Sequence, residues 1–90
     1  MVFITVRVKG PHERLCAAYE KIADYEEARV PELRCHSCAK TADGILVSGT
    51  WDSRESFDRL MASAEFRKVL ADANLPAPEI EVFEVYRSRH

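Results

Sequence analysis

The sequence is poor in cysteine and in long apolar runs, and each shortage excludes a class of protein. Three cysteines are few and odd in number, so we expect no disulfide framework. No apolar run approaches the roughly 20 residues of a membrane-spanning helix. The N-terminus opens directly on a strand-like pattern and shows no signal peptide. We therefore expect a cytoplasmic, reducing location and no membrane partner.

An excess of charge of one sign is also missing. The 13 basic and 15 acidic residues are spread along the chain and give a formal net charge of −2. Without a basic stripe or a polybasic anchor, we expect neither nucleic acid nor anionic lipid as a partner. Nor does the chain contain a glycine-rich phosphate loop, a nucleotide fingerprint or a Ser/His/Asp set. A phosphotransferase or a hydrolase is therefore not expected.

Hydrophobic residues, by contrast, are abundant. They make up 47% of 90 residues, which suggests one small domain over residues 1–90. A chain of this size buries only about 60–65% of its unfolded surface, so its own core is thin. An oligomer that buries a second apolar surface would accommodate the excess.

The hydrophobic periodicity predicts four strands and three helices. Alternating residues indicate a first strand that ends at Gly10-Pro11, and apolar residues at helical spacing indicate the long helix after it. The expected strands are 2–9, 34–41, 45–51 and 79–86, and the expected helices are 12–29, 53–61 and 63–73. This βαββαβ order with a split second helix predicts an α+β, ferredoxin-like fold with an antiparallel sheet.

Two of the predicted strands carry apolar side chains on both faces. In the last strand Ile80 and Val82 share one face, while Phe83 and Val85 share the other, and in the first strand Phe3 opposes the valine face. The helices can cover only one face of the sheet. We therefore predict a homodimer that packs sheet against sheet into a dimeric α+β barrel, with each pocket between a subunit's own sheet and helices.

The second and third strands are expected to form a hairpin. Asp-Gly at 43–44 suits a two-residue turn whose central residues have positive φ. The register that follows pairs His36 with Trp51 and Cys38 with Gly49. Because side chains alternate, His36, Cys38 and Trp51 would converge on one pocket wall.

The only tryptophan is predicted to lie where this hairpin meets a helix. Asp52 follows Trp51 and has Glu55 three residues later, which is the form of an N-cap with a reciprocal N3 carboxylate. A large aromatic side chain would thus be held between a sheet edge and a helix. Such a position is common for a small-molecule pocket.

Two histidine and cysteine features could carry chemistry. His36 is the best titratable candidate near the expected pocket, although a satisfied or solvated strand histidine is the simpler interpretation. Cys35 and Cys38 form a C-x-x-C motif, but residues three apart on a strand point to opposite faces and cannot share a zinc ion. A thioredoxin-like role needs this motif at a helix N-terminus. We expect no metal and interpret the pair as packed small residues.

Two segments resemble the antibiotic biosynthesis monooxygenase-like family of the dimeric α+β barrel superfamily. They are residues 51–57 (WDSRESF) and residues 63–67 (SAEFR). The first resembles the family's tryptophan, polar, Ser, any, Glu, small, aromatic run, and the second its later Ser-x-x-Phe/Leu-Arg. Strand order and strand lengths extend the resemblance loosely over nearly the whole chain. The motif indicates the fold more than the activity.

The resemblance implies a quinone-forming monooxygenase that uses no metal, flavin or haem, so no cofactor is expected. Trp51 and Arg67 match the family's tryptophan and arginine, whereas Val47 and Phe57 stand where the family has asparagine and tyrosine. In this interpretation Arg67 stabilises a phenolate or peroxide anion and His36 accepts a proton. The expected substrate-binding residues are Trp51, Phe57, Cys38 and Val47.

Functions of different classes remain open. The first is a cofactor-independent monooxygenase acting on a phenolic or polycyclic aromatic small molecule. The alternative is a non-catalytic dimeric α+β barrel protein that binds a small apolar ligand, and a third is an isomerase or other proton-transfer enzyme. Haem degradation is not expected. The positions that correspond approximately to the site residues of the haem-degrading branch of this superfamily hold Val6, Leu60 and Leu70.

Overall fold

Four strands and three helices make up residues 1–87, the part of the chain that the computed structural model describes. In chain order they are β1 (Val2–Lys9), α1 (His12–Arg29), β2 (Leu33–Lys40), β3 (Gly44–Trp51), α2 (Arg54–Ala62), α3 (Ala64–Ala73) and β4 (Glu79–Glu84). The order confirms the predicted βαββαβ pattern with a split second helix. Residues 88–90 of the predicted domain lie outside the described residues.

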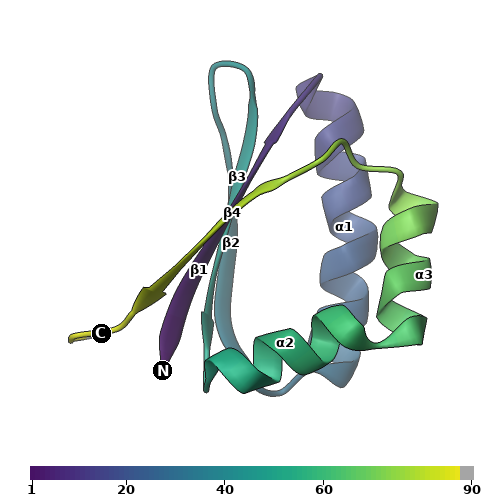
Figure 1. Cartoon of the computed structure of the whole chain (residues 1–90). Helices are drawn as coiled ribbons and strands as arrows, with labels where there is room; N and C mark the ends of the chain where they lie inside the picture. The colour runs from purple at the N-terminus through teal and green to yellow at the C-terminus, as the bar shows by residue number, and fades with distance from the viewer. Residues whose placement is uncertain (88–90) are drawn as a thin grey trace.

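The sheet is antiparallel and has the strand order β2-β3-β1-β4. All three helices lie against one face of it, as Figure 1 shows, and the opposite face carries no helix. The ferredoxin-like prediction is therefore confirmed. Because helices cover a single face, the space between sheet and helices is where a pocket can form.

The turn between β2 and β3 differs from the predicted one. The amide of Thr41 donates to the carbonyl of Gly44 over 2.9 Å, so the two loop residues are Ala42 and Asp43. Within residues 1–87, positive φ occurs only at Gly10 and Asn74. The prediction of a positive-φ turn at 43–44 is therefore wrong.

Gly44 is needed for a different reason. It is buried where β3 begins, and it pairs with Lys9 of β1. A Cβ atom built on Gly44 would lie 2.8 Å from the Lys9 Cα and still closer to the Val8 carbonyl oxygen. The close approach of two backbones, rather than the turn, requires glycine at this position.

The altered turn shifts the hairpin register by two residues. His36 pairs with Gly49 instead of Trp51, and Cys38 pairs with Val47 instead of Gly49. An irregularity between positions 33 and 35 places Leu33 opposite Trp51. The predicted pairs are wrong, but a shift of two leaves every side chain on its predicted face.

Serines rather than Asp52 cap the two short helices. The Ser53 hydroxyl accepts a hydrogen bond from the amide of Ser56 over 3.2 Å, and Ser63 does the same for Phe66 over 3.3 Å. Asp52 instead accepts a hydrogen bond from Nε of Arg34 on β2. The predicted Asp52 cap is wrong by one position, because α2 begins at Arg54 and Ser53 is the residue that precedes it.

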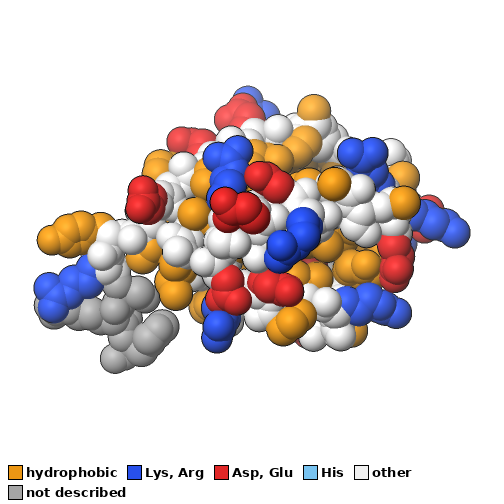
Figure 2. All heavy atoms as spheres, turned by 60° about the horizontal axis from the view of Figure 1, so that its bottom comes forward, with side chains coloured by type: hydrophobic (Ala, Val, Ile, Leu, Met, Phe, Trp, Pro, Cys, Tyr) orange, Lys and Arg blue, Asp and Glu red, His pale blue; other side chains and the backbone are white. Residues whose placement is uncertain are grey.

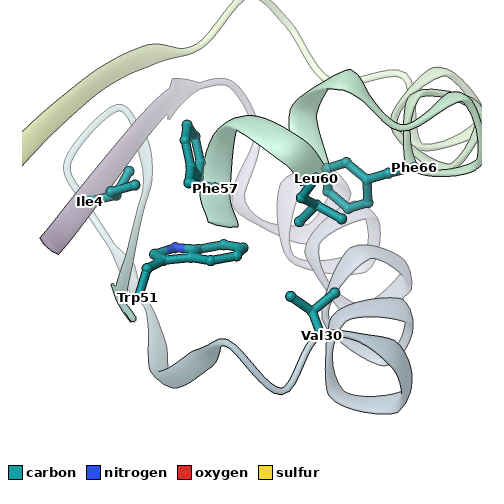
Figure 3. Packing of buried hydrophobic residues seen from close by; sticks show 6 residues of the cluster. All are labelled: Ile4, Val30, Trp51, Phe57, Leu60 and Phe66. Carbon is teal, nitrogen blue, oxygen red and sulfur yellow. The ribbon is translucent and has the colours of Figure 1, made fainter. Parts of the chain in front are cut away.

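Aromatic residues from β3, α2 and α3 form the main core (Figure 3). The ring of Phe57 meets the indole of Trp51 edge-on, with centroids 5.4 Å apart and an interplanar angle of 81°. Leu60, Phe66 and Val30 close the same cluster on the helix side. A second cluster of Val8, Leu15 and Ile45 lies nearer the hairpin. Trp51 is thereby buried on the helix-facing side of the sheet.

The face of the sheet without helices carries an aromatic pair. Phe3 and Phe83 stand opposite each other on β1 and β4, and their exposed fractions are 38% and 47%. Side chains of this size are uncommon on a solvated sheet face. On the face that Figure 2 shows, acidic and basic side chains are interspersed. None of the helices in residues 1–87 has the length and apolarity needed to cross a membrane.

Candidate functional site

A cavity of about 140 Å³ lies between the sheet and the helices and is partly open to solvent. Its lining comes from all four strands and all three helices, and most of it is apolar. The volume is close to that of the apolar cavity of roughly 150 Å³ that binds benzene in an engineered lysozyme. The cavity can therefore hold one aromatic ring.

The structure brings four of the six predicted site residues to this cavity. They are His36, Val47, Trp51 and Phe57. Cys38 and Arg67 are not among the residues that line it. His36, Val47 and Trp51 reach the cavity because their side chains lie on the helix-facing side of the sheet. A shift of two residues in the register leaves a side chain on the same face.

Arg67 lies on the exposed side of α3. Its Nε donates to the carbonyl oxygen of Met61 over 3.1 Å, which anchors the guanidinium at the α2–α3 corner. Phe66 is the residue of this turn that points inward, with 1% of its surface exposed. Successive residues on a helix differ by about 100°, so the next residue points away from the cavity.

Cys38 belongs to the second core cluster. It packs beside Cys16 against Val8, Leu15 and Ile45. Burial raises the pKa of its thiol, and the neighbouring Cys16 and Glu20 raise it further. Its side chain is therefore a small apolar filler rather than a nucleophile.

No clustered metal site accompanies these residues. Cys35 is exposed on the helix-free face while Cys38 points inward, as the strand geometry predicted. Within residues 1–87, no three His, Cys, Asp or Glu side chains gather closely enough to hold a metal ion.

A chain of three polar side chains begins at the cavity, which Tyr19 and His36 line and Glu27 does not. The Tyr19 hydroxyl lies 2.8 Å from Nδ1 of His36, and Nε2 of His36 lies 3.3 Å from a carboxylate oxygen of Glu27. Because a carboxylate only accepts, Nε2 is the nitrogen that carries a proton, and in that tautomer Nδ1 accepts from the Tyr19 hydroxyl. Sequence reasoning selected His36 but not its two partners on α1.

The Tyr19 hydroxyl stays protonated in this arrangement. Burial raises its pKa to about 12, and nearby Cys38, Glu26, Glu20 and Glu27 add to the effect. Tyr19 therefore offers a neutral hydroxyl to the cavity, which can donate a proton to His36 and accept one from a ligand.

Glu26 is a further group that sequence reasoning missed. Its residue lines the cavity, and burial raises the pKa of its carboxyl to about 7, with a further rise from the charge of Glu27. The signal was present in the spacing, since Leu15, Tyr19, Ile22 and Glu26 follow one another at intervals of four, three and four. That spacing puts Glu26 on the same inward stripe as the apolar residues.

The raised pKa of Glu26 predicts a pH dependence of stability. The folded state holds this proton more tightly than the unfolded state, so its contribution is fully present below about pH 4.5 and is lost as the pH rises through about 7. We therefore compare the free energies of unfolding of Glu26→Gln and the wild type at pH 4.5 and at pH 8. From the lower to the higher pH, the difference should change in favour of Glu26→Gln by about 1–2 kcal/mol, after a discount for partial exposure. Urea titrations at both pH values measure this. Glu20→Gln, at an exposed site on α1, should follow the wild type; equal behaviour of the two variants would contradict the assignment.

Comparison with known proteins identifies the fold. No protein-family model and no curated protein matches the sequence. Among solved structures, a variant of SnoaB, a cofactor-independent oxygenase from Streptomyces nogalater, aligns with 97% of this chain and 93% of its own at 17% identity and a TM-score of 0.76. A provisionally named antibiotic biosynthesis monooxygenase from Deinococcus radiodurans aligns with 100% of this chain and 97% of its own at 13% identity and a TM-score of 0.72.

A third structure bears on assembly. It is a dimeric ferredoxin-like protein of unknown function from Jannaschia sp. CCS1, covering 93% of this chain and 98% of its own at 13% identity and a TM-score of 0.70. Sequence identities this low show a shared fold and not a shared function. The chain has the fold of the antibiotic biosynthesis monooxygenase-like proteins, the family that its WDSRESF and SAEFR segments resemble.

Proposed function

We propose that this chain is a cofactor-independent oxygenase that converts a small, electron-rich phenol to a quinone. The observation that carries the proposal is a ring-sized apolar cavity at which the Tyr19–His36–Glu27 chain begins. Aromatic side chains and a few placed polar groups are what a phenol requires of its site. The volume favours a single ring over the polycyclic substrates that the resemblance also suggests.

The polar chain supplies a route for the substrate proton. The phenol hydroxyl donates to the Tyr19 oxygen while the Tyr19 proton moves to Nδ1 of His36. The resulting imidazolium is stabilised by the Glu27 carboxylate at Nε2. Trp51 and Phe57 hold the ring, and the product of this step is a bound phenolate.

Oxygen then reacts with the phenolate itself. A ring carbon forms a bond to O₂, and the peroxide takes the proton back from His36. Loss of water breaks the O–O bond and the C–H bond at that carbon, so one phenol and one O₂ give one quinone and one water. Arg67 has no role in this scheme, because it does not line the cavity.

Oxygen uptake by chelator-treated protein tests the proposal. A panel of single-ring alkoxyphenols is offered under air, and the consumption of O₂ and the formation of quinone are followed together. We expect equal amounts of substrate and O₂ to be consumed, with no added metal or flavin. Absence of uptake with every phenol that binds would contradict the proposal.

A second candidate is a non-catalytic protein, and one observation motivates it. Val47 and Phe57 line the cavity where the resembled family has an asparagine and a tyrosine, so polar groups are fewer than in the family pattern. A protein of this kind would bind a small apolar ligand and leave it unchanged. Tight binding of benzene or toluene together with no oxygen uptake would support this second function.

We further propose that two copies pack through the sheet faces without helices. Phe3 and Phe83 would then be covered, and similar folds described as dimeric support this arrangement. We expect the wild type to sediment as a dimer at micromolar concentration and Phe83→Glu to sediment as a monomer, because the new charge would be buried in the interface. Ala28→Glu, at an exposed site on α1, serves as the control and should stay dimeric. A monomeric wild type would contradict the proposal.

A further inference from the structure

One isoleucine on the helix-facing side of the sheet is left uncovered. Ile80 of β4 pairs with Val6 of β1, so both side chains lie on the same face, and both residues line the cavity. The exposed fraction of Ile80 is nevertheless 45%, whereas that of Ile4, which lines the same cavity from β1, is 2%. Isoleucine is among the residue types most often fully buried. The cavity therefore meets solvent at the β4 edge of the sheet.

The rim of the cavity at this edge is apolar. It consists of Leu70 on α3, Pro78 in the connector that runs from α3 to β4 (Figure 1), and Ile80. Pro78 is exposed and Leu70 is half-buried. Among residues 1–87, every lining residue that α3, this connector and β4 contribute is apolar. An alkyl group can displace water from this apolar rim without leaving a polar side chain unpaired.

An apolar floor connects this rim to the polar side chains at the other edge of the sheet. His36 on β2 pairs with Gly49, and the next inward residue of β3, Val47, pairs with Val6, which in turn pairs with Ile80. Because β2 and β4 are the two edges of the sheet, three strand spacings separate them, or about 14 Å. A single ring whose hydroxyl meets the Tyr19 oxygen is much shorter than this distance. It leaves the β4 end of the floor uncovered.

We propose that the ligand of this cavity is a phenol with a linear apolar tail, its hydroxyl at Tyr19 and its tail on the apolar rim. This deepens the proposed function, on which the choice of a phenol rests. The cavity volume of about 140 Å³ takes the ring, and the tail leaves through the opening at the β4 edge. The tail is attached para or meta to the hydroxyl, so an ortho carbon keeps the hydrogen that the oxygenation removes.

A series of 4-alkoxyphenols measures the contribution of the tail. The compounds are titrated by calorimetry under nitrogen, with alkyl parts from methyl to octyl. We expect the affinity to rise about 2–4-fold with each methylene, because each one that reaches the rim leaves water. The rise should level off at about six carbons, where the tail has crossed the roughly 14 Å between the sheet edges.

Substitutions on the rim test where the tail lies. Ile80→Ser and Leu70→Ser should each lower the affinity for 4-hexyloxyphenol about 5–20-fold, because an apolar partner of the tail is lost. Both should bind 4-methoxyphenol within about twofold of the wild type, which also shows that the variant is folded. Phe83→Ser is the matched control, since Phe83 lies on the other face of β4 with a similar exposed fraction of 47%. It should keep the wild-type affinity for both compounds.

Three results would overturn the inference. They are no binding of any 4-alkoxyphenol, equal affinities for the methyl and hexyl compounds, and a gain with tail length that survives in both rim variants or disappears in Phe83→Ser. Because binding under nitrogen needs no reaction, the expected pattern without oxygen uptake under air would contradict the oxygenase proposal and leave the tail site standing. Oxygen uptake without any gain from the tail would do the reverse.

Discussion

Gly44→Ala is expected to lower the free energy of unfolding by about 3 kcal/mol or more, a large share of the roughly 5–15 kcal/mol that stabilises a domain. The added methyl group would overlap backbone atoms of Val8 and Lys9 in β1. Backbone in a central strand cannot move aside without breaking its pairing, and β1 pairs with both β3 and β4. Urea denaturation monitored by Trp51 fluorescence measures the loss as a shift in midpoint.

A second glycine of the same strand provides the control. A Cβ atom on Gly49 would lie 2.9 Å from the Leu33 Cδ1 and 3.4 Å from the Trp51 Nε1, which are side-chain atoms. The Leu33 side chain can rotate, so we expect Gly49→Ala to cost only about 1 kcal/mol. Equal losses in the two variants would show that the close backbone approach at Gly44 is not what requires glycine.

His36→Ala is expected to lower kcat/KM for the phenol substrate by about 10²–10⁴-fold, because it removes the group that accepts the proton passed on by Tyr19. Its effect should be mostly on kcat, since the apolar side chains that hold the ring remain in place. Oxygen uptake at saturating and at low substrate concentration separates the two parameters.

Two further variants make this test specific. Tyr19→Phe removes the hydroxyl that links substrate to imidazole, and we expect a loss of the same order. His12→Ala changes an exposed histidine that hydrogen bonds to the Thr41 carbonyl, outside the cavity lining, and should keep full activity. Turnover that is unchanged in His36→Ala would remove His36 from the mechanism.

Local patterns in the sequence were sufficient to predict the strands and helices and the face that each turns toward the core. Alternation in residues 2–9 and helical spacing in residues 12–29 depend on side-chain periodicity, which each segment carries by itself. The same periodicity placed His36, Val47 and Trp51 on the side of the sheet that faces the helices. Because side chains alternate with a period of two, the error of two residues in the predicted register left each of these side chains on its predicted face.

Contacts between distant segments decided the rest. The turn lies at residues 42–43 instead of the predicted 43–44, because Gly44 is packed against β1, a strand more than thirty residues away in the chain. Arg67 was excluded from the cavity because Phe66 takes the inward position on α3, and Glu26 was included because α1 lies across the sheet with Tyr19 and Ile22 inward. Residue types and spacings describe each segment alone, whereas a cavity and the pKa of a group within it depend on which segments pack together.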